Sequence, residues 1–402
     1  MRALVSARMG ADFTRLWTAS AVSNIGDGVT MVAGPLLVAS ITTDPALVAG
    51  AVFVQQLPWL LFSLISGAYV DRLDRRRLIV VVNLFRAVAL AALTAAVATD
   101  TVTVAVIYTV FFLLGTGETL ADTAFGAFLP AIVAPDRLTG ANTRLSATFT
   151  IANQFAAKPL GAWLFVIAAA APFGVNALTF AVAAALVAKI RQVPAPVSGP
   201  HRTRLRADIA EGVRWLWGHR LLRTLAVSMG LANVAFCAAF AVFVLYTRER
   251  LGLSDVGYGF LLITFAVGGL IGTTVAASLQ KAFGTTAVLR AGLIIEVVTH
   301  ATLATTTTPL LAAAILIIFG IHSMVWGVIV VTMRQRVVPP GLLGRVASVY
   351  SLLDLGGAAL GSLLGGLLAQ IWGLTTPFWI AAAAMAVITA VAWRPLREAT
   401  TA

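Results

Sequence analysis

The sequence is poor in charged residues, which make up 11% of its 402 residues, whereas apolar residues make up 59%. An ordinary soluble domain carries about 25% charged residues, so this chain lacks the polar surface that a soluble fold needs. Its single cysteine, Cys237, lies inside an apolar run and cannot form an internal disulfide. The composition therefore excludes a soluble globular protein and a disulfide framework, and predicts an integral membrane protein.

The signatures of several catalytic classes are also missing. The sequence contains no nucleophile paired with a base, no metal-ligand cluster and no glycine-rich phosphate loop followed by Lys and Ser or Thr. His300 and His322 stand alone on apolar segments, so we expect ordinary hydrogen bonding rather than metal binding. ATP hydrolysis within the chain is excluded, and we expect neither enzyme activity nor a cofactor.

Apolar runs separated by turns and charges are the dominant pattern of the sequence. Their length suits transmembrane helices of about 20 residues, and their continuity argues against the alternating strands of a membrane barrel. We therefore expect an all-α integral membrane protein with twelve transmembrane helices. The predicted spans are 15–41, 46–70, 77–98, 102–128, 140–169, 172–192, 221–246, 256–280, 286–305, 309–332, 346–371 and 374–393.

The basic residues are distributed unevenly along these spans. All but four of the 28 lysines and arginines fall on one side when both termini are placed in the cytoplasm. Because basic loops stay inside, both termini are predicted to be cytoplasmic, and the N-terminus is read as a retained tail without a cleavable signal. The same asymmetry explains the net charge of +12 without a nucleic-acid partner. The four exceptions are Arg248, Arg250, Arg86 and Lys158.

A long connection divides the spans six and six. We predict an N-terminal six-helix bundle over 1–192, a cytoplasmic linker over 193–220 and a C-terminal six-helix bundle over 221–402. Leu205, Ile209 and Leu216 recur at helical spacing in the linker, which favours a short amphipathic helix on the inner membrane surface. A solvated tether with the same charges is the alternative.

The segment "GAYVDRLDRRR" follows the second predicted span and resembles the signature of the major facilitator superfamily. Tyr69 and Asp74 depart from the family pattern, and a degenerate second copy, "AASLQKAFG", lies at the corresponding place in the second half. The resemblance implies two pseudo-symmetric six-helix bundles and a gating role for the motif. The matching positions are Gly67, Asp71, Arg72, Arg75 and Arg76.

Four further segments resemble one branch of that superfamily, the third drug:proton antiporter family. They are "SNIGDGVTMVAGPLL", "GTGETLADTAFGAFLPAIV", "LTGANTRLSATFTIANQ" and "DIAEGVRWLWGHRLLR". The branch contains macrolide-efflux, enterobactin-export and mycobacterial multidrug-efflux proteins. Lys158 departs from it, because the branch usually has Gly before the proline at that position.

The resemblance implies a secondary transporter that exports an amphiphilic drug or secondary metabolite by alternating access, driven by protons. Its expected partners are the small substrate, protons and lipid, and we expect a monomer in the bacterial cytoplasmic membrane. Uptake of a siderophore or nutrient shares the fold and is the alternative direction. A membrane sensor or assembly factor without transport is the alternative class.

Carboxylates and cations at membrane depth are candidates for the transport site, because each costs about 2.5 to 3.5 kcal/mol to insert. Asp27 lies in the first span, where it either exchanges a proton, contacts a substrate cation or makes a fixed structural hydrogen bond. Glu118 and Asp122 are four residues apart and share a helix face. They form either an ion-pair cluster or a proton relay, with Arg86 and Arg144 as candidate partners.

Other buried features are more ambiguous. Lys158 either pairs with Asp27, snorkels to the membrane surface or contacts an anionic substrate. Glu296 and Asp354 are expected to be structural. Small residues at helical spacing predict close helix contacts, and the resemblance implies that these ridges meet the opposite half, with static packing equally open. The ridges are Gly357, Gly361 and Gly365, and Gly268, Gly272 and Ala276.

The gating motif leads to a first prediction. By resemblance, Asp71 accepts hydrogen bonds from the opposite half near Gly344 to Ala347, where a helix N-terminus favours an anion. Asp71→Asn should therefore slow transport while leaving membrane insertion intact. Transport rates normalised to the amount of protein in the membrane test this, and a normal rate in the variant would refute the latch.

Overall fold

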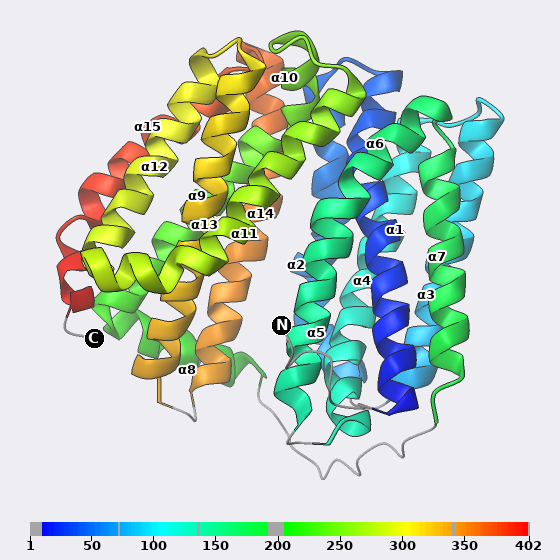
Figure 1. Cartoon of the computed structure of the whole chain (residues 1–402), viewed down its shortest axis with the longest axis horizontal. Helices are drawn as coiled ribbons and strands as arrows, with labels where there is room; N and C mark the ends of the chain where they lie inside the picture. The colour runs from blue at the N-terminus through cyan, green and yellow to red at the C-terminus, as the bar shows by residue number, and fades with distance from the viewer. Residues whose placement is uncertain (1–9, 71–72, 135–136, 192–204, 340–341, 401–402) are drawn as a thin grey trace. The chain divides into compact units, whose positions relative to one another are not determined.

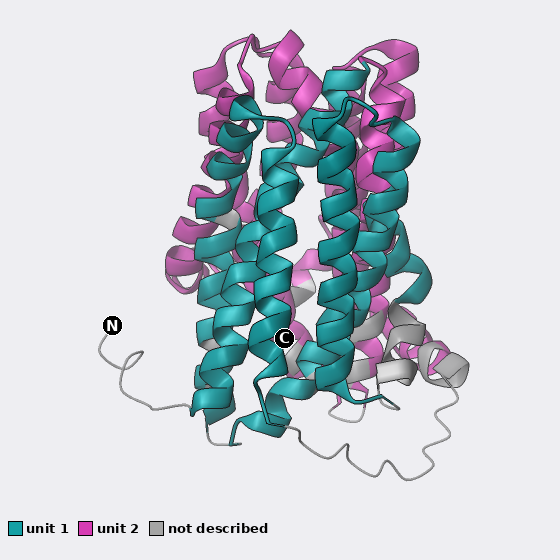
Figure 2. Ribbon diagram, turned by 90° about the vertical axis from the view of Figure 1, so that its right-hand side faces the viewer, with its two compact units in different colours: residues 1–42, 54–200 teal, residues 43–53, 201–402 magenta. Residues whose placement is uncertain are grey.

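The computed structural model describes residues 10–70, 73–134, 137–191, 205–339 and 342–400, and its regular structure there is entirely helical. The chain falls into two compact units, coloured separately in Figure 2. The first comprises residues 1–42 and 54–200, and the second comprises residues 43–53 and 201–402. The boundary at residues 53 and 54 falls inside the second helix, so this helix belongs partly to each unit.

The helices of the first unit follow the predicted spans closely (Figure 1). In lipid the backbone must satisfy its own hydrogen bonds, so each apolar run becomes a helix. Helix α1 is the most buried of them, and it packs against α5, α6 and α7. The elements are α1 (Ala11–Ile41), α2 (Pro45–Val70), α3 (Arg75–Ala98), α4 (Val104–Ile132), α5 (Leu138–Phe149), η3 (Thr150–Ala156), α6 (Ala157–Ile167) and α7 (Ala171–Ala188).

The second unit contains the remaining predicted spans. Its main packing pairs are α9 with α14, α11 with α13 and α12 with α15. The elements are α8 (Leu205–Gly218), α9 (Arg220–Ala241), α10 (Phe243–Glu249), α11 (Asp255–Phe283), α12 (Thr285–Thr305), α13 (Pro309–Val337), α14 (Leu343–Trp372), α15 (Thr376–Ala392) and the 3-10 turn η4 (Pro395–Thr400).

Two of the predicted spans are interrupted. The span at 140–169 changes from α-helix to a π-helix over Thr150–Ala156 and back. Pro159 accounts for the change, because it has no backbone N–H to donate to the Phe155 carbonyl and its ring crowds that carbonyl. The span at 221–246 breaks at Val242. Among the described residues, ten helices meet the length and hydropathy of a membrane span, and α15 is shorter, so the number twelve stays a prediction.

The predicted linker helix is present as α8. Leu216 is fully buried and joins the hydrophobic core of the second unit. A Cβ on Gly212 would lie 2.9 Å from the Arg345 backbone, so α8 lies close against the start of α14. Arg345 also donates a hydrogen bond to Glu211. This segment is therefore a docked helix rather than a solvated tether.

The outward face of the helices is apolar, as a lipid-facing surface requires. On α3, Val81 and Val88 are 62% and 69% exposed, whereas Arg86 on the same helix is 5% exposed. A soluble helix has the opposite pattern, with its charges outside and its aliphatic residues inside. Beyond its first turn, helix α3 therefore buries Arg86 and turns apolar residues such as Val81 and Val88 outward.

The small-residue ridges lie at helix crossings inside the second unit. Gly361 and Gly365 on α14 face the carbonyls of Val234 and Ala238 on α9, and Gly268 on α11 faces Ile317 on α13. These ridges therefore pack statically within the second unit, which was the alternative to contact with the opposite half. The next residue on α14, Gly366, lies against Pro45 to Ala49 at the start of α2, the span that the resemblance implies as a partner.

Neighbouring glycines on α11 provide a matched stability test. A Cβ on Gly268 would lie 2.0 Å from the Ile317 carbonyl oxygen, whereas a Cβ on Gly269 would meet nothing within 4 Å. Gly268→Ala should lower stability by about 1 to 3 kcal/mol through overpacking. Gly269→Ala should be neutral or stabilise by up to about 1 kcal/mol, because Ala favours helix. Thermal unfolding in detergent measures both, and equal melting temperatures would contradict this crossing.

Candidate functional site

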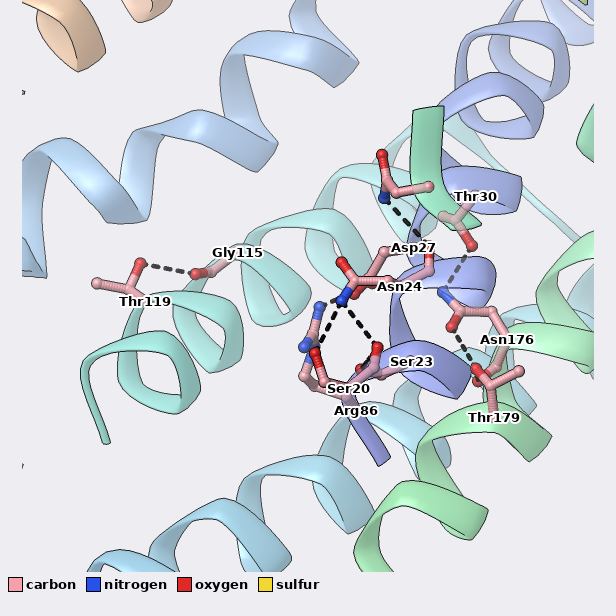
Figure 3. A network of polar contacts seen from close by, with 11 residues as sticks. Ser20, Ser23, Asn24, Asp27, Thr30, Arg86, Gly115, Thr119, Asn176 and Thr179 are labelled. Carbon is pink, nitrogen blue, oxygen red and sulfur yellow. Dashed lines mark hydrogen bonds and ion pairs between the residues drawn. The ribbon is translucent and has the colours of Figure 1, made fainter. Parts of the chain in front are cut away.

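The candidate site of the first unit is built around an ion pair between α1 and α3. The Arg86 Nη2 atom donates to Asp27 Oδ1 at 3.0 Å, and the Arg86 and Asp27 side chains are 6% and 30% exposed. Figure 3 shows Arg86 and Asp27 pointing toward each other beside Asn24. The guanidinium also lies 3.9 Å from the ring centroid of Phe180 on α7. One cation thus joins three helices.

The same guanidinium acts on the two carboxylates of α4. Arg86 interacts electrostatically with both Glu118 and Asp122, and Asp27 lies near enough to act on both as well. The Arg86 stem crosses Gly117, where a Cβ would lie 2.9 Å from Arg86 Cδ. The structure therefore brings together four of the predicted site residues: Asp27 is paired with Arg86, and the two carboxylates of α4 lie within electrostatic range of that pair.

Polar side chains around α1 fix the orientation of this cluster. Asn24 donates through Nδ2 to the Ser20 carbonyl at 2.7 Å, and Asn153 donates to the Asn24 carbonyl at 3.1 Å. Asn176 on α7 donates to Thr30 at 2.7 Å and accepts from Thr179 at 2.9 Å, as Figure 3 shows. These bonds hold η3 and α7 on α1, beside the turn that carries Asp27.

The two glycines that flank Asp27 serve helix contact. A Cβ on Gly26 would lie 2.1 Å from the Asn176 amide oxygen, and a Cβ on Gly28 would lie 2.6 Å from Ala157 Cβ. Because both positions are filled by neighbouring helices, they do not open α1 to a substrate. Their effect is to bring α6 and α7 close enough to enclose Asp27.

The remaining predicted cation, Lys158, lies apart from this pair. It begins the first turn of α6, directly after the π-helix, and it is 5% exposed. In the part of the chain that the structure describes, the Lys158 ammonium group has no hydrogen bond or ion pair, and Asp27 has Arg86 as its partner. π-Helical turns are frequent at functional sites, so Lys158 stays a candidate.

The gating motif is described only in part. Asp71 and Arg72 lie outside the described residues, and Gly67 lies in α2, where side-chain surroundings are not described. Arg75 begins α3, and Arg76 donates to the Val187 carbonyl at 3.4 Å and to the Ala188 carbonyl at the end of α7. Arg76 thus binds a helix C-terminus within the first unit, where a cation is favoured.

Asp74, which departs from the family motif, has a structural role. Its side chain accepts a hydrogen bond from the Arg77 backbone N–H at 3.1 Å and is the N-cap of α3. Aspartate is among the preferred N-cap residues, and loss of such a cap costs about 1 kcal/mol. The substitution of the family glycine by Asp74 therefore gives α3 a defined start.

A second buried acid in the other unit has a partner that the sequence does not reveal. Glu296 on α12 lies 3.2 Å through Oε1 from His322 Nε2 on α13, and His300 Nδ1 lies 2.9 Å from the Glu296 carbonyl oxygen. The two lone histidines, expected to make ordinary hydrogen bonds, both do so at Glu296: His322 at its carboxylate and His300 at its backbone carbonyl. Separate helices carry Glu296 and His322, so no local spacing signals this pair.

Comparison with known proteins identifies relatives over nearly the whole chain. A family model described as transmembrane secretion effector matches residues 7–401. The chain is 29% identical over 379 residues to the multidrug efflux pump Tap of Mycolicibacterium fortuitum, covering 90% of each protein. It is 26% identical over 388 residues to Tap of Mycobacterium tuberculosis, covering 90% of this chain and 87% of the pump. The family resemblance indicated by the sequence motifs is confirmed.

Solved structures of similar fold cover the chain equally well. The nucleoside transporter NupG superposes with a TM-score of 0.77 at 11% identity, covering 96% of this chain and 99% of the transporter. A bacterial homologue of the iron transporter ferroportin, in an inward-facing state, superposes with a TM-score of 0.76 at 17% identity, covering 97% and 99%. At these identities the likeness extends to the fold alone.

The charge cluster of the first unit can be tested by removing its cation. Arg86→Leu leaves Asp27, and the two carboxylates near it, without a guanidinium. Breaking a buried ion pair from one side costs about 3 to 5 kcal/mol. We expect a strongly reduced folded fraction by size-exclusion chromatography and a lower melting temperature.

A double variant controls for lost packing. Asp27→Asn added to Arg86→Leu should recover part of the loss, because it removes one of the unbalanced charges. Strictly additive effects of the two substitutions would show that Asp27 and Arg86 do not interact energetically.

Proposed function

The chain belongs to the transmembrane secretion effector family of major facilitator transporters, and on that premise we propose that it exports amphiphilic compounds in exchange for protons. It is a multi-pass protein of the cell membrane and not an enzyme. Its curated relatives are multidrug efflux pumps. Drugs and secondary metabolites with both polar and apolar parts are therefore the proposed substrate class.

The observation that carries the coupling proposal is the cluster of three carboxylates around Arg86. One guanidinium balances one of the negative charges of Asp27, Glu118 and Asp122, so two remain unbalanced when all three are ionised. Repulsion between neighbouring carboxylates makes proton uptake by one of them favourable. Glu118 is partly exposed and Asp122 is exposed, which leaves these two carboxylates accessible to solvent or substrate.

In the proposed cycle, Asp27 changes partners with its protonation state. The ionised carboxylate accepts from Arg86 at 3.0 Å and holds α1 to α3. A proton on Asp27 weakens this pair and releases the guanidinium toward Glu118 or Asp122. Protonation of Asp27 would thus shift the Arg86 guanidinium from α1 toward α4. Such a change in the contacts between helices can be coupled to the rocking motion of the two halves of a transporter.

The proton gradient is the proposed energy source. Each charge that crosses the membrane along a potential of 100 mV contributes about 2.3 kcal/mol. The two helical units are the proposed moving bodies of an alternating-access cycle, with cytoplasmic termini, and the motif from Gly67 to Arg76 is the proposed gate. The protein is proposed to act as a monomer without a cofactor.

Export rather than uptake is the proposed direction, on the strength of the relatives' names. Expression in cells should lower the accumulation of a fluorescent drug, and an uncoupler should restore it. Higher accumulation on expression would instead favour the uptake of a nutrient or siderophore. Unchanged accumulation of every compound tested would favour a sensor or assembly role without transport.

The role of Asp27 is testable with a matched pair of isosteric variants. Asp27→Asn keeps the shape but cannot exchange a proton, so proton-driven efflux should fall about tenfold or more. Asp100→Asn is the control, because Asp100 is exposed at the end of α3 and has a φ of 55° that Asn also tolerates. Efflux from vesicles with an imposed pH gradient measures both. Gradient-driven efflux at the unmodified rate in Asp27→Asn would refute Asp27 as the coupling residue.

A further inference from the structure

The second unit contains a cavity of about 280 Å³ bounded by α9, α11, α12, α13 and α14. Its wall combines aromatic rings with two carboxylates, those of Glu296 and Asp354. Ser228, Asn233 and Ser323 add neutral polar groups. Neither Lys nor Arg is among the described residues that line it. Most of the wall is therefore apolar, and the two acids give it a negative charge when they are ionised.

Glu296 is the buried acid of this cavity, with 7% of its surface exposed. Its Oε1 atom has His322 Nε2 at 3.2 Å, but its Oε2 atom is buried without a hydrogen-bond partner. His300 does not supply one, because its Nδ1 atom lies 3.9 Å from Oε2 and 2.9 Å from the Glu296 carbonyl oxygen. Buried polar atoms are nearly always hydrogen-bonded, so the carboxylate of Glu296, which lines the cavity, has one oxygen whose hydrogen-bonding capacity the protein leaves unused.

Asp354 contributes a second acid from α14. Its main-chain carbonyl accepts a hydrogen bond from Asn233 Nδ2 at 2.6 Å, which fixes Asn233 of α9 beside it. Its side chain lines the cavity together with Glu296. Two acids on different helices therefore face the same space, which favours a cation over an anion or a neutral molecule.

Aromatic rings form another wall. Phe236 stacks on Phe319 with centroids 5.5 Å apart and on Phe265 with centroids 5.8 Å apart. Trp326 lies edge-on to His322 at 5.8 Å and also lines the cavity. The faces of such rings attract organic cations and stack on flat ligands.

We propose that this cavity binds an organic monocation that carries an aromatic ring, with Glu296 as its anionic contact and the Phe236 cluster as its stacking surface. The alternative is that Glu296 only joins α12 to α13 through His322. A metal ion is a poorer match, because no group of three or more His, Cys, Asp or Glu among the described residues has metal-binding geometry. The proposal rests on the proposed export function in identifying the bound cation as a substrate.

Binding to the purified full chain in detergent tests the site without transport. The probe is ethidium, an aromatic cation whose charge does not change with pH, and the neutral dye Nile red is the comparison. Glu296→Gln keeps the shape and a hydrogen bond to His322 but removes the charge. We expect it to weaken ethidium binding about tenfold or more, measured by fluorescence anisotropy, with Nile red binding unchanged.

Two further variants separate charge from structure. Glu296→Asp retains the carboxylate and should bind ethidium within about threefold of the unmodified chain. Glu249→Gln, at an exposed position of α10, is the matched control and should have no effect. Melting temperatures confirm that each variant is folded.

The outcomes are distinct from those of the coupling test. Unchanged ethidium affinity in Glu296→Gln, or an equal loss of Nile red and ethidium binding, would overturn the cation site while leaving proton-coupled export untouched. Conversely, selective loss of ethidium binding in Glu296→Gln supports the site even if Asp27→Asn transports normally. A purified chain that binds no ethidium at all would also overturn it.

Discussion

The arginine at the centre of the first unit is the interaction on which its interior depends. A lipid environment satisfies neither backbone groups nor charges, so backbone groups bond within helices and charges must be balanced inside the protein. Arg86 meets this requirement for α1 through Asp27, stacks on α7 through Phe180 and acts on the two carboxylates of α4. The helices are therefore joined by charge as well as by packing. A change in the protonation of any one carboxylate alters the balance for all of them.

Small residues make this arrangement possible by bringing the backbones close together. Gly26 and Gly28 let Asn176 and Ala157 approach α1, and Gly117 lets the Arg86 stem cross α4. A side chain at any of these positions would separate the helices and admit lipid or water to the charges. The glycines thus act on the electrostatics indirectly, because close packing lowers the local dielectric and strengthens each charge interaction.

The helix pattern could be predicted from the sequence because it depends on local properties. Continuous apolar runs determine most of the helix bounds, and the amphipathic period of 205–216 is sufficient to predict α8. Pro159 is a local signal for the interruption at Thr150–Ala156, because proline disturbs the helical turn that precedes it. The partners of Asp27 and Glu296 had no such signal, because Arg86 and His322 lie 59 and 26 residues away on other helices. The candidate residues can therefore be identified from the sequence, because an ionisable side chain is costly to insert in a membrane. Which of them pair with each other can be seen only in the packed structure.

The two units differ in the side chain that pairs with their buried carboxylate, which is an arginine in the first and a histidine in the second. This difference bears on the proposed mechanism. In the first, one permanent cation pairs with Asp27 and lies within electrostatic range of Glu118 and Asp122, so in the proposed cycle a proton on Asp27 lowers the excess negative charge and releases Arg86 toward the other two. In the second, Glu296 has a titratable histidine in place of an arginine and keeps one oxygen without a partner. An arginine cannot give up its proton, whereas a histidine can. The first arrangement suits a site that must stay folded through repeated protonation, and the second suits a site where a cation from outside the protein completes the charge balance.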